Sequence, residues 1–367
     1  MSKLFSPLSL GGVQIGNRVT VSPMCQYSSH DGTANDWHLQ HLMNLSLSGA
    51  GLLTLEATHV SAEGRITHGC AGLWSDENEQ ALKRVVDACR AVSPIKLGIQ
   101  LAHAGRKGSA QRPWEGRGAL SPAEGAWETF APSAVPLAPG WHTPRALDRA
   151  GIVRIRDAFA ASAKRALNIG FDLIELHSAH GYLLNEFLSP LTNQRTDAFG
   201  GSLENRMRFP LEVFEAVRAV WPKGRALGVR IPGSDYVPGA WGPADGAAYA
   251  RALTERGCDF VTVSGGGVVL DAKVPTGPGY QVPFAEFVKR EADIVTGAVG
   301  LITEARQAEA ILAEGKADYV AIARAFLFNP RWAWHAAIEL GDDIKFVAQY
   351  ERCHPKMWPP AAQLAAV

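Results

Sequence analysis

The stretch "FDLIELHSAHGY" (171–182) is mostly apolar in its first half and carries polar, titratable side chains in its second half. Its first half is a short, continuous apolar run, which is typical of a strand buried on both faces. Its second half places His177, His180 and Tyr182 directly at the end of that run. Three proton-handling side chains at the end of a buried strand indicate a functional site if other strands end at the same place.

Seven more segments are similar to the first half of this stretch, because each is short, continuous and rich in Val, Ile and Leu. Together with 171–177, the predicted strands are residues 18–24, 51–57, 96–103, 226–232, 259–265, 293–300 and 318–324. Helical spacing of apolar residues predicts helices over 76–92, 148–169, 203–220, 244–256, 304–314 and 330–340. Strands that alternate with helices favour a parallel sheet, and eight of them favour a closed barrel. The predicted fold class is therefore α/β, an eight-stranded (β/α)8 TIM barrel.

The chain is predicted to form a single domain over residues 1–367, since barrels of this kind often run past ~250 residues. One connection, residues 104–147 after the third strand, is too long for a simple strand-to-helix turn. It contains several Pro and Gly residues and is predicted to form a lid or rim over the site. Residues 341–367 are predicted to form a C-terminal tail.

The composition argues against several classes of protein. Lys plus Arg and Asp plus Glu both number 36, so neither nucleic acid nor an anionic membrane is an expected partner. The five cysteines form no CxxC pair, which argues against a zinc or iron–sulfur site, and no metal is predicted. The N-terminus lacks the apolar segment of a signal peptide, and no run of ~18 apolar residues is present. A cytoplasmic location is therefore expected.

The carboxyl ends of the other strands carry residues that suit a phosphorylated ring cofactor. Gly300 and Arg324 lie at the ends of the seventh and eighth strands, where barrels often bind phosphate. Gln100 can donate and accept hydrogen bonds, and Arg230 can neutralise an anion. This combination suits a reduced flavin, whose ring carries negative charge.

Two plainer interpretations of His177 and His180 stay open at this point. The pair could bind a metal ion through its HxxH spacing, as in a metal-dependent hydrolase on the same barrel, but such a site needs a third ligand. The histidines could also be structural. Tyr182 taken alone would more often be a packed aromatic residue, and a buried free cysteine such as Cys25 is usually inert.

Six segments together resemble one known family. They are "SPMCQY" (22–27), "DWHLQHL" (36–42), "IQLAHAGRK" (99–107), "PWEG" (113–116), "LIELHSAHGYLLNEFLSPLTNQRTDAFGGSLENRMRF" (173–209) and "QYER" (349–352). They are similar to the Old Yellow Enzyme family of FMN-dependent ene-reductases, and in particular to its bacterial branch that includes the xenobiotic reductases. The resemblance covers nearly the whole chain, and the long segment at 173–209 is highly specific.

The resemblance implies an α/β barrel that binds FMN non-covalently at the carboxyl ends of its strands. The implied cofactor-binding residues fall into two groups. Along the flavin ring lie Ser22, Pro23 and Met24, with Cys25 near the reactive edge, Ala57 beside the ring, Gln100 at the pyrimidine side and Arg230 near N1. Gly300, Ala323 and Arg324 are implied to hold the phosphate, and Val299 is also counted among the cofactor-binding residues.

The resemblance also implies the reaction. NADPH or NADH reduces the flavin, and hydride then passes from FMN N5 to the activated C=C bond of an α,β-unsaturated carbonyl or nitro compound. His177 and His180 would donate hydrogen bonds to the substrate oxygen, where charge develops as hydride arrives. Tyr182 would give the proton and Tyr27 would hydrogen-bond the substrate, while Cys25 is counted among the catalytic residues.

Arg352, in the terminal "QYER", matches an arginine that reaches the neighbouring subunit's substrate site in this branch, which implies a homodimer or homotetramer. Two positions depart from the family pattern. Ala323 stands where several relatives carry glycine, and Val299 stands where a tryptophan can occur, so a roomier substrate pocket is expected. The tail after Arg352, including Trp358, matches no pattern of the family.

Overall fold

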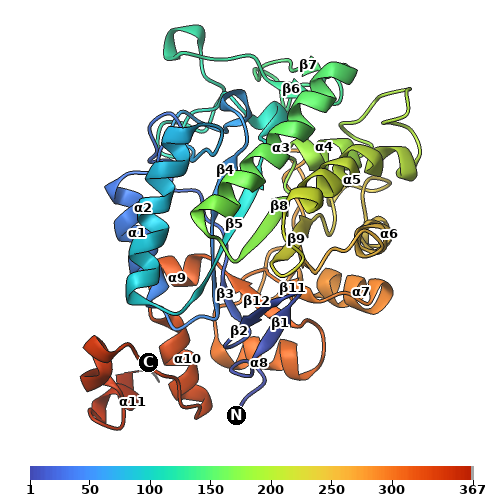
Figure 1. Cartoon of the computed structure of the whole chain (residues 1–367). Coiled ribbons are helices and arrows are strands. Elements are labelled where there is room, and N and C mark those ends of the chain that lie inside the picture. The colour runs from blue at the N-terminus through green and yellow to red at the C-terminus, as the bar shows by residue number, and fades with distance from the viewer. Residues whose placement is uncertain (365–367) are drawn as a thin grey trace.

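The computed structural model describes residues 1–364 and places eight strands in a closed barrel (Figure 1). Around the barrel the strands follow the order β10-β11-β12-β3-β4-β5-β8-β9, and neighbours pair in parallel. Their bounds are β3 (Val19–Val21), β4 (Leu52–His59), β5 (Lys96–Ala102), β8 (Leu173–His177), β9 (Ala226–Ile231), β10 (Phe260–Val263), β11 (Thr296–Ala298) and β12 (Tyr319–Ile322). Each strand lies in one of the predicted segments, with β4 running on to His59, so the barrel prediction is confirmed.

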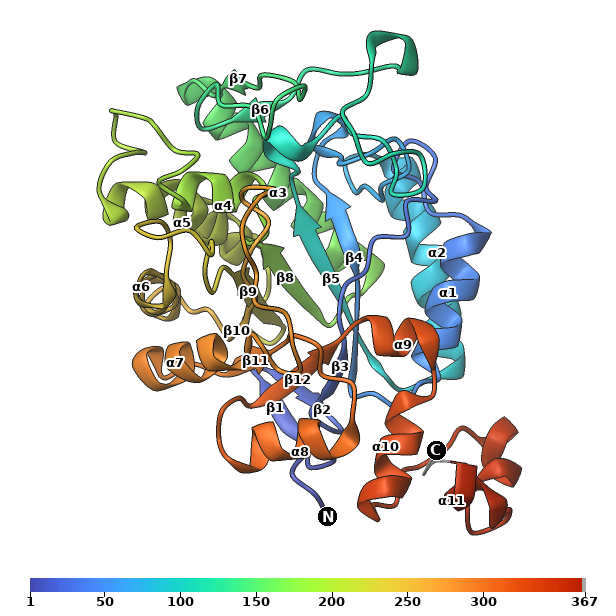
Figure 2. The same cartoon turned by 180° about the vertical axis from the view of Figure 1, so that it is seen from behind.

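Most helices pack around the outside of the barrel (Figures 1 and 2). The predicted ones are α2 (Asp76–Val92), α3 (Arg149–Ile169), α5 (Leu203–Val220), α6 (Pro243–Thr254), α8 (Ala305–Ala313) and α10 (Trp332–Leu340). Those not predicted are α1 (Asp36–Ser46), α4 (Leu183–Leu188), α7 (Val282–Ala292), α9 (Arg324–Phe328) and α11 (Pro360–Leu364). α4 and α9, with 6 and 5 residues, are too short to show a helical period. α1 buries His38 beside Leu42 and Leu45, so its inner face is not uniformly apolar.

A β-hairpin that was not predicted closes one end of the barrel. Its strands, β1 (Leu8–Leu10) and β2 (Val13–Ile15), pair antiparallel. The hairpin shares a buried apolar cluster with the first residues of five barrel strands, which are Leu52, Leu173, Ala226, Phe260 and Tyr319. Because side chains fill the amino-terminal end of the barrel, the carboxyl end is left for a ligand.

The long segment after β5 extends beyond the strand ends at the top of the molecule (Figure 1). It contains η2 (Gly105–Lys107), η3 (Pro122–Glu124), β6 (Phe130–Ala131) and β7 (Arg145–Ala146). The buried guanidinium of Arg106 donates to the carbonyl oxygens of Val135, Pro136 and Val268 at 3.2, 3.0 and 2.6 Å. One cation therefore ties this segment to the loop after β10. Within residues 1–364, no helix has both the length and the hydropathy needed to cross a membrane.

Candidate active site

A cavity of about 180 Å³ opens at the carboxyl ends of β3, β9, β10, β11 and β12. Its lining includes six of the predicted cofactor residues, which are Ser22, Arg230, Val299, Gly300, Ala323 and Arg324. The wall also includes residues that were not predicted, among them Ser264, Tyr280 and Gln281. The structure therefore gathers residues from five strand ends around one space that is open to a ligand.

Gly300 forms a part of the cavity wall that no other residue can replace without strain. Its φ is +112°, and a Cβ atom added there would lie 2.9 Å from the backbone nitrogen of Gln281. Only glycine adopts such a conformation freely, and only glycine lets the two backbones approach so closely. The wall is therefore bare backbone at this point, as close approach to a phosphate requires.

Arg230 presents an unused donor beside this cavity. It is 6% exposed, and its Nη2 donates to Ser22 Oγ at 2.8 Å. Its Nε lies 3.7 Å from Glu175 Oε1 and has no hydrogen-bond partner. A buried guanidinium that lines the cavity fits an anionic ligand. Gln100 donates through Nε2 to Glu175 Oε1 at 2.7 Å, which leaves one N–H and the carbonyl oxygen of this amide for a ligand.

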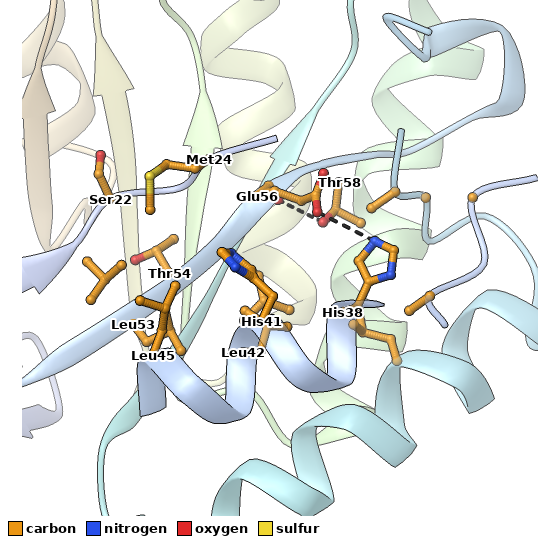
Figure 3. Close-up of a pocket in the computed structure, with 17 residues that line it drawn as sticks. Ser22, Met24, His38, His41, Leu42, Leu45, Leu53, Thr54, Glu56 and Thr58 are labelled. Atoms are coloured by element: carbon orange, nitrogen blue, oxygen red, sulfur yellow. Dashed lines mark hydrogen bonds and ion pairs between the residues drawn. The ribbon is translucent and has the colours of Figure 1, made fainter. Parts of the chain in front are cut away.

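A β-bulge at Glu56 positions the predicted flavin-binding loop. The register of β4 against β5 shifts there, so Glu56 is the extra residue and Ala57 pairs with Gln100. The carboxyl group of Glu56 accepts from the backbone nitrogen of Gln26 at 2.9 Å and lies 3.6 Å from Nε2 of His38 on α1 (Figure 3). Burial raises the pKa of Glu56 to about 8. The bulge thus aligns Ala57 and anchors the loop that follows β3.

His177, His180 and Tyr182 come together at the end of β8. The ring centroid of His177 lies 5.1 Å from that of His180 and 4.9 Å from that of Tyr182. His180 has φ +61° and Gly181 has φ +70°, so the chain turns back on itself between the histidines and the tyrosine. Such a conformation is uncommon for a residue other than glycine, and it is typical of functional sites.

Both histidines are neutral donors at neutral pH. Burial and the neighbouring His180 lower the pKa of His177 well below its usual range, and burial with the Arg230 charge lowers the pKa of His180 to about 3. Nδ1 of His177 accepts from the backbone nitrogen of Ala179 at 3.3 Å, which leaves the proton on Nε2. Nε2 of His180 lies 2.7 Å from Ser264 Oγ, and with that hydroxyl as donor the proton of His180 is on Nδ1.

Cys25, Tyr27 and Tyr182 pack against one apolar patch formed by Ile66, Cys70, Ala104 and Ala110. Burial, followed by the neighbouring Cys25, raises the pKa of both tyrosines above their usual range. Burial and the nearby Glu56 likewise raise the pKa of Cys25, so the thiol keeps its proton and is a poor nucleophile. Both tyrosines therefore carry a proton at neutral pH.

Lys107, which the sequence reasoning missed, fixes the loop that carries the histidines. Its Nζ donates to the carbonyl oxygen of His180 at 2.9 Å and to that of Gly267 at 3.1 Å, and lies 4.8 Å from the ring centroid of Tyr182. Burial lowers the pKa of Lys107 to about 8. A lysine inside the "IQLAHAGRK" segment gives no signal of this contact, because its partners come from distant loops.

Arg352 lies away from the cavity of its own chain. It belongs to η4 (Ala348–Cys353), where Tyr350 packs against Trp334. Trp334 lines a surface hollow with Gly51 and Lys96, at the amino-terminal ends of β4 and β5. Figure 2 shows the tail at the lower edge of the molecule, opposite the segment after β5. The structure therefore does not bring Arg352 to this site within one chain.

The metal-site interpretation of the histidine pair lacks its third ligand. In the part of the chain that the structure describes, no three His, Cys, Asp or Glu side chains gather so as to hold a metal ion. The alternative of a metal-dependent hydrolase therefore has no support from the geometry.

The barrel and the cavity at its carboxyl end fit a flavin-binding oxidoreductase, and comparison with known proteins shows that class. Residues 3–343 match the NADH:flavin oxidoreductase / NADH oxidase family, and the chain belongs to this family. The resemblance to Old Yellow Enzyme proteins is thereby confirmed, as are FMN as the cofactor and a reduced nicotinamide as the electron donor.

Several relatives cover the whole barrel. The chain is 47% identical to an NADPH dehydrogenase of Geobacillus sp. (strain WCH70), over 95% of this chain and 98% of the relative. It is 40% identical to an NADPH dehydrogenase of Bacillus subtilis (strain 168), with the same coverage. Among solved structures, morphinone reductase superimposes with a TM-score of 0.77 at 30% identity, over 94% of this chain and 91% of that one.

Proposed function

We propose that the protein reduces the activated C=C bond of α,β-unsaturated carbonyl compounds, and of nitro compounds, at the expense of NADPH. The observation that carries this proposal is the convergence of two neutral imidazole donors and a protonated tyrosine beside the cofactor cavity. NADPH is favoured over NADH because the relatives at 40–47% identity are named NADPH dehydrogenases.

The chemistry of the cavity fits FMN. The positive charge of Arg230 at the cavity suits the anionic ring of the reduced cofactor, and the bare backbone at Gly300 with the side chain of Arg324 suits the phosphate. Gln100 would hold the ring edge, with Ala57 beside it across the bulge. When bound, FMN takes hydride from the nicotinamide and supplies it to the substrate.

His177 and His180 would bind the substrate oxygen through Nε2–H and Nδ1–H. Each donor strengthens its hydrogen bond as negative charge develops on that oxygen, which stabilises the transition state more than the ground state. Fixed donors of this kind typically contribute about 10²–10³-fold each to turnover. Tyr182 would deliver a proton to the α-carbon, and Tyr27, which packs against the same apolar patch, would add a hydrogen bond to the substrate.

Arg352 would complete the substrate site of a neighbouring subunit. It lies on the exposed η4, far from its own cavity, and nearby Tyr350 and Trp358 are 42% exposed each. An arginine offered to a partner in this way requires at least a homodimer, which sedimentation at micromolar concentration tests directly. A monomer that turns over at full rate would remove this part of the proposal.

The central experiment compares the wild-type protein with the His177→Ala plus His180→Ala variant. The purified wild type is expected to show a flavin absorbance spectrum, to oxidise NADPH continuously under anaerobic conditions only when 2-cyclohexenone is present, and to bind a phenol. The double variant is expected to keep FMN but to lose phenol affinity and at least about 10²-fold in turnover. Unchanged turnover in an FMN-loaded variant would contradict the proposed role of the pair.

A further inference from the structure

A hydrogen-bonded polar network lies inside the barrel around Glu175. Glu175 is the middle residue of β8 and is 4% exposed. Its Oε1 accepts from Gln100 Nε2 at 2.7 Å and lies 3.7 Å from Arg230 Nε, while its Oε2 accepts from Thr262 Oγ1. Thr262 Oγ1 in turn lies 2.8 Å from the hydroxyl of Tyr319. One carboxylate therefore contacts both residues that are expected to hold the flavin ring.

Every group that faces Glu175 in this network can donate a hydrogen bond or carries positive charge. Donors approach both oxygens and a guanidinium lies 3.7 Å away, so the network is complementary to the negative charge of a carboxylate. The ion pair is incomplete, because Arg230 Nε has no hydrogen-bond partner and Arg230 Nη2 binds Ser22 instead. Arg230 thus carries a charge that Glu175 offsets but does not fully engage.

We propose that Glu175 is a positioning residue that sets the reduction potential of the bound FMN, by holding Gln100 in place and by offsetting the charge of Arg230. This inference rests on the proposed cofactor site. Reduction adds negative charge to the flavin ring, and Arg230 stabilises that charge. Glu175 weakens this stabilisation through its own negative charge, so it keeps the potential lower and the reduced enzyme a stronger hydride donor.

The test is the two-electron midpoint potential of FMN in the Glu175→Gln variant. Glutamine has nearly the same shape, and the hydroxyl chain can reverse to accept its N–H, because Tyr319 OH can donate to the carbonyl oxygen of Val261 at 3.2 Å. The expected shift is positive, by about tenfold or more in the reduction equilibrium, which is ~30 mV for a two-electron couple. The dissociation constant of oxidised FMN, measured by fluorescence titration, is expected to change much less, since the oxidised ring is neutral.

Tyr319→Phe is the matched control, because it removes a hydroxyl from the same network without changing its charge. Its midpoint potential is expected to equal that of the wild type. An FMN-loaded Glu175→Gln protein with an unchanged or lower potential would overturn the inference, as would an equal shift in Tyr319→Phe. If Glu175→Gln does not fold, Glu175→Met, which also removes the charge at a similar length, decides by the same measurement: a potential raised by about 30 mV or more supports the inference, and an unchanged or lower potential overturns it. If the proposed cofactor site itself is wrong, the wild-type protein will bind no FMN in the same titration, which distinguishes that outcome from a failure of the inference about Glu175.

Discussion

Replacing Lys107 by methionine tests how the catalytic loop is held. The ammonium group joins the loop after β8 to the loop after β10 through the carbonyl oxygens of His180 and Gly267, at 2.9 and 3.1 Å. It also lies over the ring of Tyr182 at 4.8 Å. Methionine has a similar length and no charge, so Lys107→Met removes all three interactions without leaving a large cavity.

The size of the effect follows from the two hydrogen bonds. A hydrogen bond from a charged donor contributes about 1.5–3 kcal/mol, and part of this is cancelled by the cost of burying the ammonium. We therefore expect the present loop conformation to lose about 1–3 kcal/mol relative to its alternatives. Because His180 is held at φ +61°, a conformation that costs about 1–3 kcal/mol, release of the tether lets it relax. The turnover number should fall about 10–100-fold.

The assay is anaerobic reduction of 2-cyclohexenone with NADPH at matched FMN occupancy, together with the melting temperature. Lys289→Met is the control, since Lys289 donates to Asp318 Oδ1 at 2.8 Å near the amino-terminal end of β12. Lys289→Met is expected to lower stability slightly and leave turnover unchanged. A Lys107→Met protein that is fully loaded with FMN and turns over at the wild-type rate would show that this lysine does not hold the catalytic loop in its active conformation.

Three further predictions follow from the site and its surroundings. Gly300→Ala should weaken FMN binding at least about tenfold in a fluorescence titration, because the added Cβ would lie 2.9 Å from the backbone of Gln281. Gly315→Ala is the control and should leave FMN binding unchanged, since φ is +74° there but nothing lies within 4 Å of the added Cβ. Tyr182→Phe should slow the oxidation of the reduced enzyme by an enone about 10²-fold or more in stopped-flow traces, and it should leave reduction of the enzyme by NADPH unchanged. If the variant and the wild type are oxidised by the enone at the same rate, the proton has another source. The free energy of unfolding should fall by several kcal/mol as the pH is lowered from 6 to 4.5, because burial lowers the pKa of seven histidines in the fold and only three carboxyl groups with raised pKa values oppose them. A flat urea-denaturation profile over this pH range would contradict this. The histidines are His38, His41, His59, His103, His177, His180 and His335, and the carboxyl groups are those of Glu56, Glu186 and Asp235.

The barrel could be predicted because strands buried on both faces produce continuous apolar runs, and residues at the carboxyl ends of such strands share one end of the barrel. The gathering of Ser22, Arg230, Gly300 and Arg324 around one cavity follows from this rule alone. The hairpin at residues 8–15 did not follow from it, because its two strands have 3 residues each and give no alternation to read.

The supporting residues could not be predicted because their contacts are long-range. Lys107 acts through loops that follow other strands, and Ser264 reaches His180 from the end of β10. Glu56 depends on a bulge, which is a shift of register that one sequence does not show. Glu175 did leave a signal, since a carboxylate in the middle of the apolar run "LIELH" must find buried partners.

The charge pattern of the site explains why its donors are neutral. The positive charges of Arg230 and Lys107, together with burial, lower the pKa values of His177 and His180. Each imidazole therefore stays neutral and carries a single N–H. The pair can therefore hydrogen-bond a carbonyl oxygen, whose developing negative charge the two nearby cations also favour. In the proposed reaction the same pair must also tolerate a nicotinamide ring, which becomes positive when it gives up hydride. Two imidazolium groups would add to the repulsion of that product, whereas neutral N–H donors serve both substrates in turn.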